Sequence, residues 1–162
     1  MKKLWAPWRM KYISTISKSE KGCVFCTKPR TNKDRANLIL WRGKHCFVVM
    51  NLYPYNNGHL MIVPYLHTAK LEELDSNVIT EMWGAVARST AILKKAFRAE
   101  GFNVGLNIGR VGGAGIDQHL HLHIVPRWNG DTNFMAILGE TKVISQGLED
   151  AYDALLPYFR KK

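Results

Sequence analysis

Three histidines recur at every second position in the stretch Gln118-His119-Leu120-His121-Leu122-His123-Ile124-Val125-Pro126-Arg127. A β-strand sends successive side chains to opposite faces, so a strand here would place the three imidazoles together and the aliphatic residues opposite them. Each imidazole carries a donor and an acceptor that need partners, which makes three of them poor material for a core. The pattern therefore predicts a cleft that holds an anion or a metal ion.

The first chemistry that suits these histidines is nucleophilic catalysis. A neutral imidazole is a competent nucleophile at pH 7, and its attack on a nucleotide phosphorus would form a phosphoramidate. One difficult phosphoryl or nucleotidyl transfer would then become two easier steps, in which neighbouring histidines hold phosphate oxygens or protonate the leaving group. The glycine-rich loop at 109–115 precedes the histidines and offers backbone N–H groups to a phosphate.

The second chemistry is metal binding. Cys23 and Cys26 have the spacing of a pair of zinc ligands. The same spacing occurs in redox pairs, but no βαβ pattern surrounds this one. Cys46 lies in an apolar stretch and is expected in the core. Zinc needs two further ligands, and the six histidines make a Cys2His2 site reasonable. Their spacing does not identify which two would bind the metal.

The elements that would position these groups can be predicted from hydrophobic patterning. A hairpin is expected from strands at 38–41 and 45–50, after a polar loop at 27–37. Three further strands are expected: 59–63, which ends before Pro64, then 102–108, then the histidine stretch. Five strands in this order indicate a mostly antiparallel central sheet.

Helices are expected before the predicted strand at 102–108 and again at the C-terminal end of the chain. Residues 68–74 suit a short helix, and residues 148–159 a C-terminal one. Ser76 suits the N-cap of a long helix that Gly101 follows. Its core stripe is predicted to comprise Ile79, Met82, Trp83, Val86, Thr90, Leu93 and Phe97. Together, the elements predict an α+β fold.

Size and charge narrow the class of protein. The chain of 162 residues suits a single domain over 1–162, with a basic, aromatic N-terminal arm at 1–22 that is expected to be ordered. No apolar run is long enough to span a membrane, and the N-terminus lacks a signal peptide's apolar core. We therefore expect a cytoplasmic protein with reduced cysteines. The net charge of +10 favours a polyanionic ligand, but no basic block is long enough for a nucleic-acid tail.

The histidine stretch resembles the signature of the histidine triad superfamily, in which three histidines alternate with apolar residues. The earlier segment Asn57-Gly58-His59-Leu60-Met61-Ile62-Val63-Pro64 is similar to the Gly-His segment of that family, and His67 is typical of its zinc-containing bacterial branch. The segments at 4–10 and 126–134 resemble the subset related to diadenosine tetraphosphate phosphorylases and hydrolases. The resemblance covers roughly residues 20–130.

This resemblance implies a function and a site. The activity would be cleavage of dinucleoside polyphosphates or related nucleotides, with phosphate or water as the acceptor. The middle histidine, His121, would be the nucleophile that forms a nucleotidyl-histidine intermediate, with His59 and His123 beside the α-phosphate. The nucleotide-binding residues would be Asn51 at the ribose and Asn107, Gly113, Ala114 and Gly115 along the phosphate.

The resemblance also implies a cofactor and a quaternary structure. Zinc would be structural, with Cys23, Cys26, His67 and His119 as its ligands, so His119 would leave the catalytic group. The family pairs long helices and central sheets, which implies a homodimer.

The sequence departs from the family pattern just before the first histidine. Many members have a serine or threonine there that binds phosphate, whereas this chain has Ile116-Asp117-Gln118. Phosphate contacts would then come from backbone N–H groups or from Gln118. Three alternatives stay open: a nucleoside phosphoramidase, a nucleotide-binding or signalling module without turnover, and a nucleic-acid-binding protein, which ranks last because no separate nucleic-acid motif is present.

Overall fold

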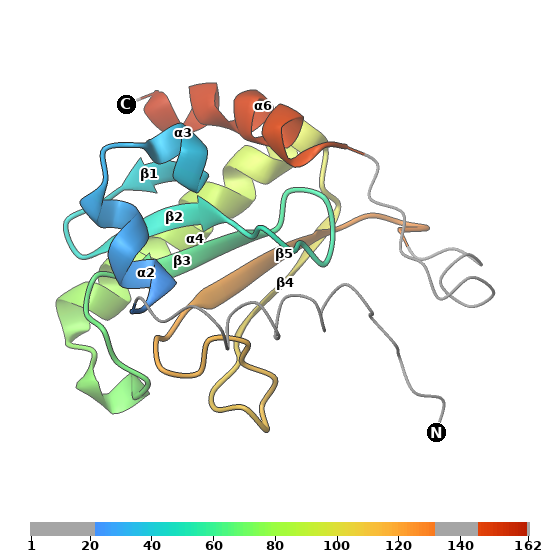
Figure 1. Ribbon diagram of the computed structural model, residues 1–162. Coiled ribbons are helices and arrows are strands. Elements are labelled where there is room, and N and C mark those ends of the chain that lie inside the picture. Colours follow the sequence, from blue (N-terminus) through green and yellow to red (C-terminus); the bar gives the residue numbers. More distant parts are fainter. Residues whose placement is uncertain (1–21, 132–145, 162) are drawn as a thin grey trace, which may run out of the picture.

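A five-stranded antiparallel sheet forms the centre of the molecule. The structure is a computed structural model that describes residues 22–131 and 146–161. The strands lie in the order β1-β2-β3-β5-β4 (Figure 1). Their bounds are β1 Ile39–Arg42, β2 Cys46–Met50, β3 Leu60–Pro64, β4 Gly101–Leu106 and β5 Leu122–Arg127. All four neighbouring pairs are antiparallel, which confirms the predicted sheet.

The middle strands carry the core, and β4 forms an edge. All five residues of β2 and all five of β3 are buried, as expected for strands covered on both faces. In β4 the residues from Asn103 to Gly105 are exposed. The strand β5 pairs with both neighbours, so that His123 lies opposite Met61 on β3 and Gly105 on β4.

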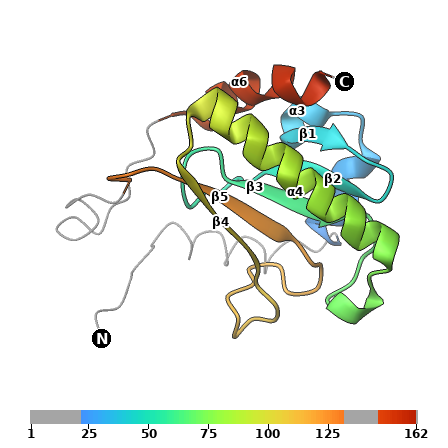
Figure 2. The ribbon, with the colours of Figure 1, turned by 180° about the vertical axis from the view of Figure 1, so that it is seen from behind.

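Among the described residues, two longer helices and four short ones accompany the sheet. The long helix α4 crosses the back of the sheet diagonally (Figure 2), and α6 packs against α4 and β1. The bounds of the helices are α2 Val24–Thr27, η1 Lys28–Arg30, α3 Asp34–Asn37, η2 Leu71–Glu73, α4 Ser76–Phe97 and α6 Leu148–Arg160. The predicted long helix and C-terminal helix are confirmed, and the α+β class with them.

The long helix differs from its prediction at both ends and in its buried face. Its N-cap is Asp75, whose carboxylate accepts from the N–H groups of Asn77 and Val78, and its C-cap is Arg98, which has the left-handed conformation. Gly101 is already part of β4. Two members of the predicted stripe, Ile79 and Trp83, are 38% and 56% exposed. The buried face instead includes the small residues Ala85 and Ser89.

Three further differences concern short segments. The predicted loop at 27–37 contains η1 and α3, which are held by tertiary contacts: Lys28 Nζ donates to the Asn37 carbonyl, and Asp34 forms an ion pair with Arg42. Residues 68–74 contain only the one-turn helix η2. Pro64 belongs to β3 and pairs with Cys46 rather than stopping the strand before it. Cys46 is fully buried in the core, as predicted.

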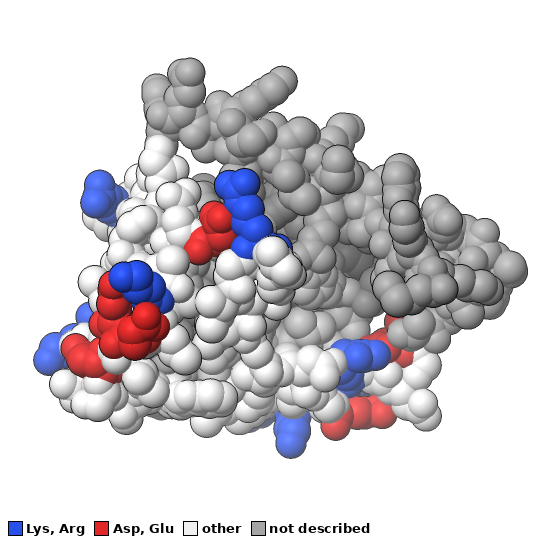
Figure 3. Space-filling model, turned by 90° about the horizontal axis from the view of Figure 1, so that it is seen from below, with Lys and Arg blue, Asp and Glu red and all other residues white. Residues whose placement is uncertain are grey.

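Several expectations concern residues that the structure does not cover. The N-terminal arm at 1–22 lies outside the described residues apart from Gly22, and so does the end of the loop at 127–134. Within the described ranges, no helix is both long and apolar enough to cross a membrane. On the face in Figure 3, acidic and basic side chains of the described residues lie in small mixed groups.

Candidate functional site

The three triad histidines do not all lie in a strand. The strand β5 begins at Leu122, so His123 is within it, whereas His119 and His121 belong to the segment that leads in. The observed strand is therefore shorter than the one predicted, which covered all three histidines. The alternation itself is preserved at Leu120, Leu122 and Ile124, which are 3% exposed or less and lie in the core.

The first histidine lies in a cluster of four metal-binding side chains. The ligand atoms of Cys23, Cys26, His67 and His119 all lie within 4.8 Å of one another. His119 Nδ1 lies 3.3 Å from Cys23 Sγ, 3.6 Å from Cys26 Sγ and 3.1 Å from His67 Nδ1. Cys26 Sγ lies 3.3 Å from His67 Nδ1. Both cysteines are free thiols rather than a disulfide.

This cluster fits a tetrahedral metal ion. A metal bound by sulfur at about 2.3 Å and by nitrogen at about 2.0 Å keeps its donors roughly 3.3 to 3.8 Å apart. His119 Nε2 donates to the Pro64 carbonyl at 2.9 Å, which leaves the lone pair on Nδ1 facing the cluster. Burial lowers the pKa of His119, and this favours the neutral form that a metal requires.

The middle histidine has the opposite arrangement of its nitrogens. His121 Nδ1 donates to the main-chain carbonyl of His119 at 2.8 Å, so the lone pair of the neutral ring is on Nε2. The side chain is 5% exposed, and burial lowers the pKa of His121 below its usual value. The ring is therefore neutral at pH 7, which is the state that a nucleophile needs.

The other two predicted catalytic histidines form a hydrogen-bonded pair. His59 Nε2 lies 2.9 Å from His123 Nδ1, and the His123 ring lies 4.8 Å from the His121 ring. The Tyr55 backbone N–H donates to His59 Nδ1 at 3.0 Å, so a neutral His59 has its proton on Nε2 and donates to His123. The structure thus brings together His59, His121 and His123, although His59 comes from the segment that leads into β3.

The backbone before His59 needs a glycine. Gly58 has φ of +68°, and a Cβ there would lie 2.9 Å from the Phe97 ring and 3.0 Å from Leu93 on α4. His59 itself is completely buried. Gly58 therefore lets the chain pass close to α4 and enter β3 with His59 facing His123.

The predicted nucleotide-binding residues fall into two groups. Asn51 contacts His59, with Nδ2 3.3 Å from Nδ1, and its Oδ1 accepts from the Tyr53 N–H. Asn107 lies beside the turn of the glycine-rich loop, where the Ala114 N–H donates to the Gly109 carbonyl. This loop contains Gly113, with φ of +90°, and Gly115. Gln118 is exposed, and no described contact links it to the histidines.

A cleft of about 800 Å³ opens between α3 and α6. Leu52, the residue after Asn51, is one of its walls, and Leu38, Leu148 and Tyr152 add apolar surface.

Two residues at the site were missed by the sequence analysis. Phe25, between the two cysteines, has its ring 5.0 Å from that of His121. Tyr55 has its ring 4.8 Å from that of His59 and 5.9 Å from that of His123. Neither was marked by a motif: His119 and His121 are distant from Phe25 in the sequence, and Tyr55 stands in a loop four residues before His59.

The fold and the arrangement of histidines define a class of protein. The family model described as the HIT domain matches residues 32–130. This match covers more than half of the chain, so the protein belongs to the HIT family.

Comparisons with individual proteins narrow this similarity further. The chain is 40% identical over 156 residues to a protein of Mycobacterium tuberculosis named AP-4-A phosphorylase, across 93% of this chain and 80% of that one. A solved structure described as a Zn-bound histidine triad family protein from Mycobacterium smegmatis has a TM-score of 0.68 and 22% identity, over 85% and 93% of the two chains. A solved structure described as a hypothetical histidine triad nucleotide-binding protein from Sulfolobus tokodaii has a TM-score of 0.66 and 27% identity, over 85% and 89% of the two chains.

Proposed function

We propose that this protein is an enzyme that cleaves dinucleoside polyphosphates such as diadenosine tetraphosphate by transferring a nucleotidyl group through His121. The observation that carries the proposal is the environment of His121: the ring is buried and its Nδ1 donates to a carbonyl, so Nε2 has the lone pair of the neutral ring. The 40% identical relative from Mycobacterium tuberculosis supports the substrate class.

The proposed reaction has two steps. The Nε2 lone pair of His121 attacks the α-phosphorus, a P–N bond forms, and the P–O bond to the leaving nucleotide breaks with its electron pair remaining on oxygen. Phosphate or water then attacks the same phosphorus, the P–N bond breaks, and the pair returns to Nε2. With diadenosine tetraphosphate the leaving nucleotide is ATP, and the second product is ADP with phosphate or AMP with water.

The surrounding residues have supporting roles in this proposal. His123, paired with His59, lies beside His121 and would contact the α-phosphate oxygens. The loop residues Gly113, Ala114 and Gly115 would line the phosphates, and Asn107 and Gln118 would complete this contact. Asn51 would contact the ribose, and the cleft that begins at Leu52 would accept the base.

We also propose that Cys23, Cys26, His67 and His119 bind one structural zinc ion. The donor set and the donor separations of 3.1–3.6 Å support it. Zinc at this position would join the chain before β1 to the segment before β5. It would supply stability there rather than chemistry, since all four ligands come from the protein.

A homodimer in the cytoplasm completes the proposal. The edge strand β4 pairs only with β5 among the described strands and exposes Val104, which supports pairing with a second copy. Thiolate ligands need a reducing compartment, which supports the cytoplasm. Sedimentation equilibrium should give twice the mass of the chain, and a Val104→Lys variant should shift it toward the monomer.

The deciding experiment follows the products from diadenosine tetraphosphate. Purified protein is incubated with and without inorganic phosphate, and the nucleotides are separated by ion-exchange chromatography. ATP with ADP identifies phosphate as the acceptor, and ATP with AMP identifies water. The protein is also denatured without acid while it turns over substrate. A covalently bound nucleotide should then be found on the wild type and not on His121→Ala.

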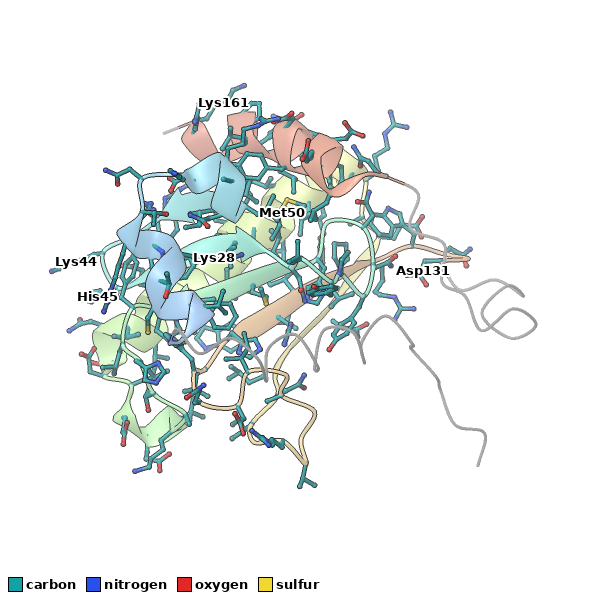
Figure 4. The ribbon with its side chains drawn as sticks, in the orientation of Figure 1. Lys28, Lys44, His45, Met50, Asp131 and Lys161 are labelled. Carbon is teal, nitrogen blue, oxygen red and sulfur yellow. The ribbon has the colours of Figure 1, made fainter. Side chains whose placement is uncertain are left out.

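His45 provides a matched control. It is a histidine at the turn between β1 and β2, beside Lys44 (Figure 4), and no described contact links its ring to the site. His45→Ala should keep wild-type turnover. Full turnover by His121→Ala would overturn the proposal, and nucleotide binding without products would replace it with a non-catalytic binding function.

A further inference from the structure

Phe25 is a buried aromatic side chain that contacts both kinds of histidine at the site. It is 3% exposed and lies between the two cysteines of the metal-binding cluster. Its ring lies 5.6 Å from the ring of His119, edge-on, and 5.0 Å from the ring of His121. One side chain therefore packs against a metal-binding histidine and against the proposed nucleophile.

The position of Phe25 depends on the cysteines. It belongs to α2, which has only four residues, and a helix of this length is not stable by itself. The Cys23 carbonyl accepts from the N–H groups of Cys26 and Thr27, which closes the turn around Phe25. The two Sγ atoms then tie this turn to His119, at 3.3 and 3.6 Å.

The His121 imidazole is also connected to the metal-binding cluster through the main chain. The carbonyl that accepts from His121 Nδ1 belongs to His119. The hydrogen bond fixes one nitrogen of the ring but leaves the ring able to tilt about it. Packing against Phe25 and the adjacent His123 ring restricts that tilt.

We propose that Phe25 is a positioning residue that holds the His121 imidazole in the orientation needed for attack on phosphorus. This inference rests on the proposed function of His121. Its physical basis is that misplacing a reacting group by about 1 Å can cost roughly 100-fold in rate without changing substrate binding. Truncating the Phe25 side chain should therefore lower kcat and leave KM nearly unchanged.

The test compares two truncations of buried phenylalanines. Phe25→Leu removes the ring beside His121. Phe47→Leu removes one from β2, where Phe47 is fully buried and stacks on Tyr65, and serves as the control for loss of core packing. For Phe25→Leu we expect kcat with diadenosine tetraphosphate to fall about 10- to 100-fold, KM to change less than threefold, and one zinc per chain to remain. For Phe47→Leu we expect kcat to stay within twofold.

A second readout does not depend on turnover. Long-range ¹H–¹⁵N spectra of protein labelled at histidine report the tautomer and order of each ring, and the signals missing from His121→Asn identify those of His121. We expect a sharp Nδ1–H signal in the wild type and in Phe47→Leu, and a broadened or absent one in Phe25→Leu. An unchanged His121 signal in Phe25→Leu would overturn the inference, as would a fall in kcat equal to that of Phe47→Leu. Turnover by His121→Ala would instead refute the proposed function.

Discussion

His119 and His121 are two residues apart, and both are buried, yet different nitrogens of the two rings are left with a lone pair. His119 uses Nε2 to donate to the Pro64 carbonyl and turns Nδ1 toward the cysteines. His121 uses Nδ1 to donate to the His119 carbonyl and keeps its lone pair on Nε2. In the proposed assignment of roles, the hydrogen bond of the second nitrogen therefore separates the metal-binding imidazole from the nucleophilic one.

The comparison is tested most strongly by removing each ring in turn. His121→Ala should lower kcat by about 10⁴-fold or more, because the covalent route is lost. Its zinc content and Tm should remain those of the wild type. His119→Ala should instead lose the metal. Zinc analysis and calorimetry of both variants check this, and loss of zinc from His121→Ala would contradict the separation.

Removing the metal tests the stabilising half of the comparison. The cluster joins segments that are distant in the sequence, so a Cys23→Ser/Cys26→Ser variant should bind no zinc and unfold at a Tm lower by roughly 10 °C or more. Differential scanning calorimetry in the presence of a reductant measures this. A zinc-free variant with an unchanged Tm would show that the cluster does not stabilise the fold.

His123 provides an intermediate effect. It lies beside His121 and is hydrogen-bonded to His59, so it contributes to the proposed chemistry without being the nucleophile. His123→Asn should lower kcat by about 10²- to 10⁴-fold, less than His121→Ala, while nucleotide can still be trapped on His121. Steady-state kinetics and trapping together check this, and a variant that forms no nucleotidyl intermediate would make His123 equal in importance to His121.

The smallest expected effect, on stability, is at Glu81. The two histidine rings donate to main-chain carbonyls, whereas the Glu81 side chain accepts from main-chain N–H groups. Burial raises the pKa of Glu81, but the N–H groups of His45 and Cys46 that it accepts from outweigh this, so the net pKa is lowered. A carboxyl group with a lowered pKa in the folded state adds to the free energy of unfolding at pH values above its unfolded pKa of about 4.3. This added stability is lost as the pH falls through the pKa of the folded state.

Urea unfolding of wild type and Glu81→Gln from pH 7 to pH 3 measures this contribution. The wild type should be the more stable protein at pH 7, and the difference should shrink below about pH 4. A difference that does not change with pH would mean that the charge of Glu81 adds nothing.

The sheet and the long helix could be predicted because their patterns are local. Runs of apolar residues identified the other strands, alternation identified the histidine stretch, and helical spacing identified α4. The buried face of α4 was partly mistaken, since Trp83 is as apolar as the other residues of the predicted stripe and only packing decides that Ala85 and Ser89 are buried. The short helices α2 and α3 escaped prediction because tertiary contacts, not propensity, hold them.

The candidate site was predictable in its residue types but not in its geometry. Family resemblance, rather than spacing, separated His119 from His121. The tautomers depend on where the carbonyls of Pro64 and His119 lie, and the sequence contains no signal for this. The roles assigned to Asn51, Asn107, Gln118 and the loop remain predictions.

The two carbonyls that assign the tautomers belong to the main chain, and this affects how the site can change by mutation. Every residue at position 64 or 119 brings a carbonyl oxygen, so no single codon change deletes either acceptor. A ligand and a nucleophile therefore cannot exchange roles through loss of an acceptor side chain. Replacing the Pro64 or His119 peptide by a backbone ester through chemical synthesis would weaken these acceptors while keeping every side chain.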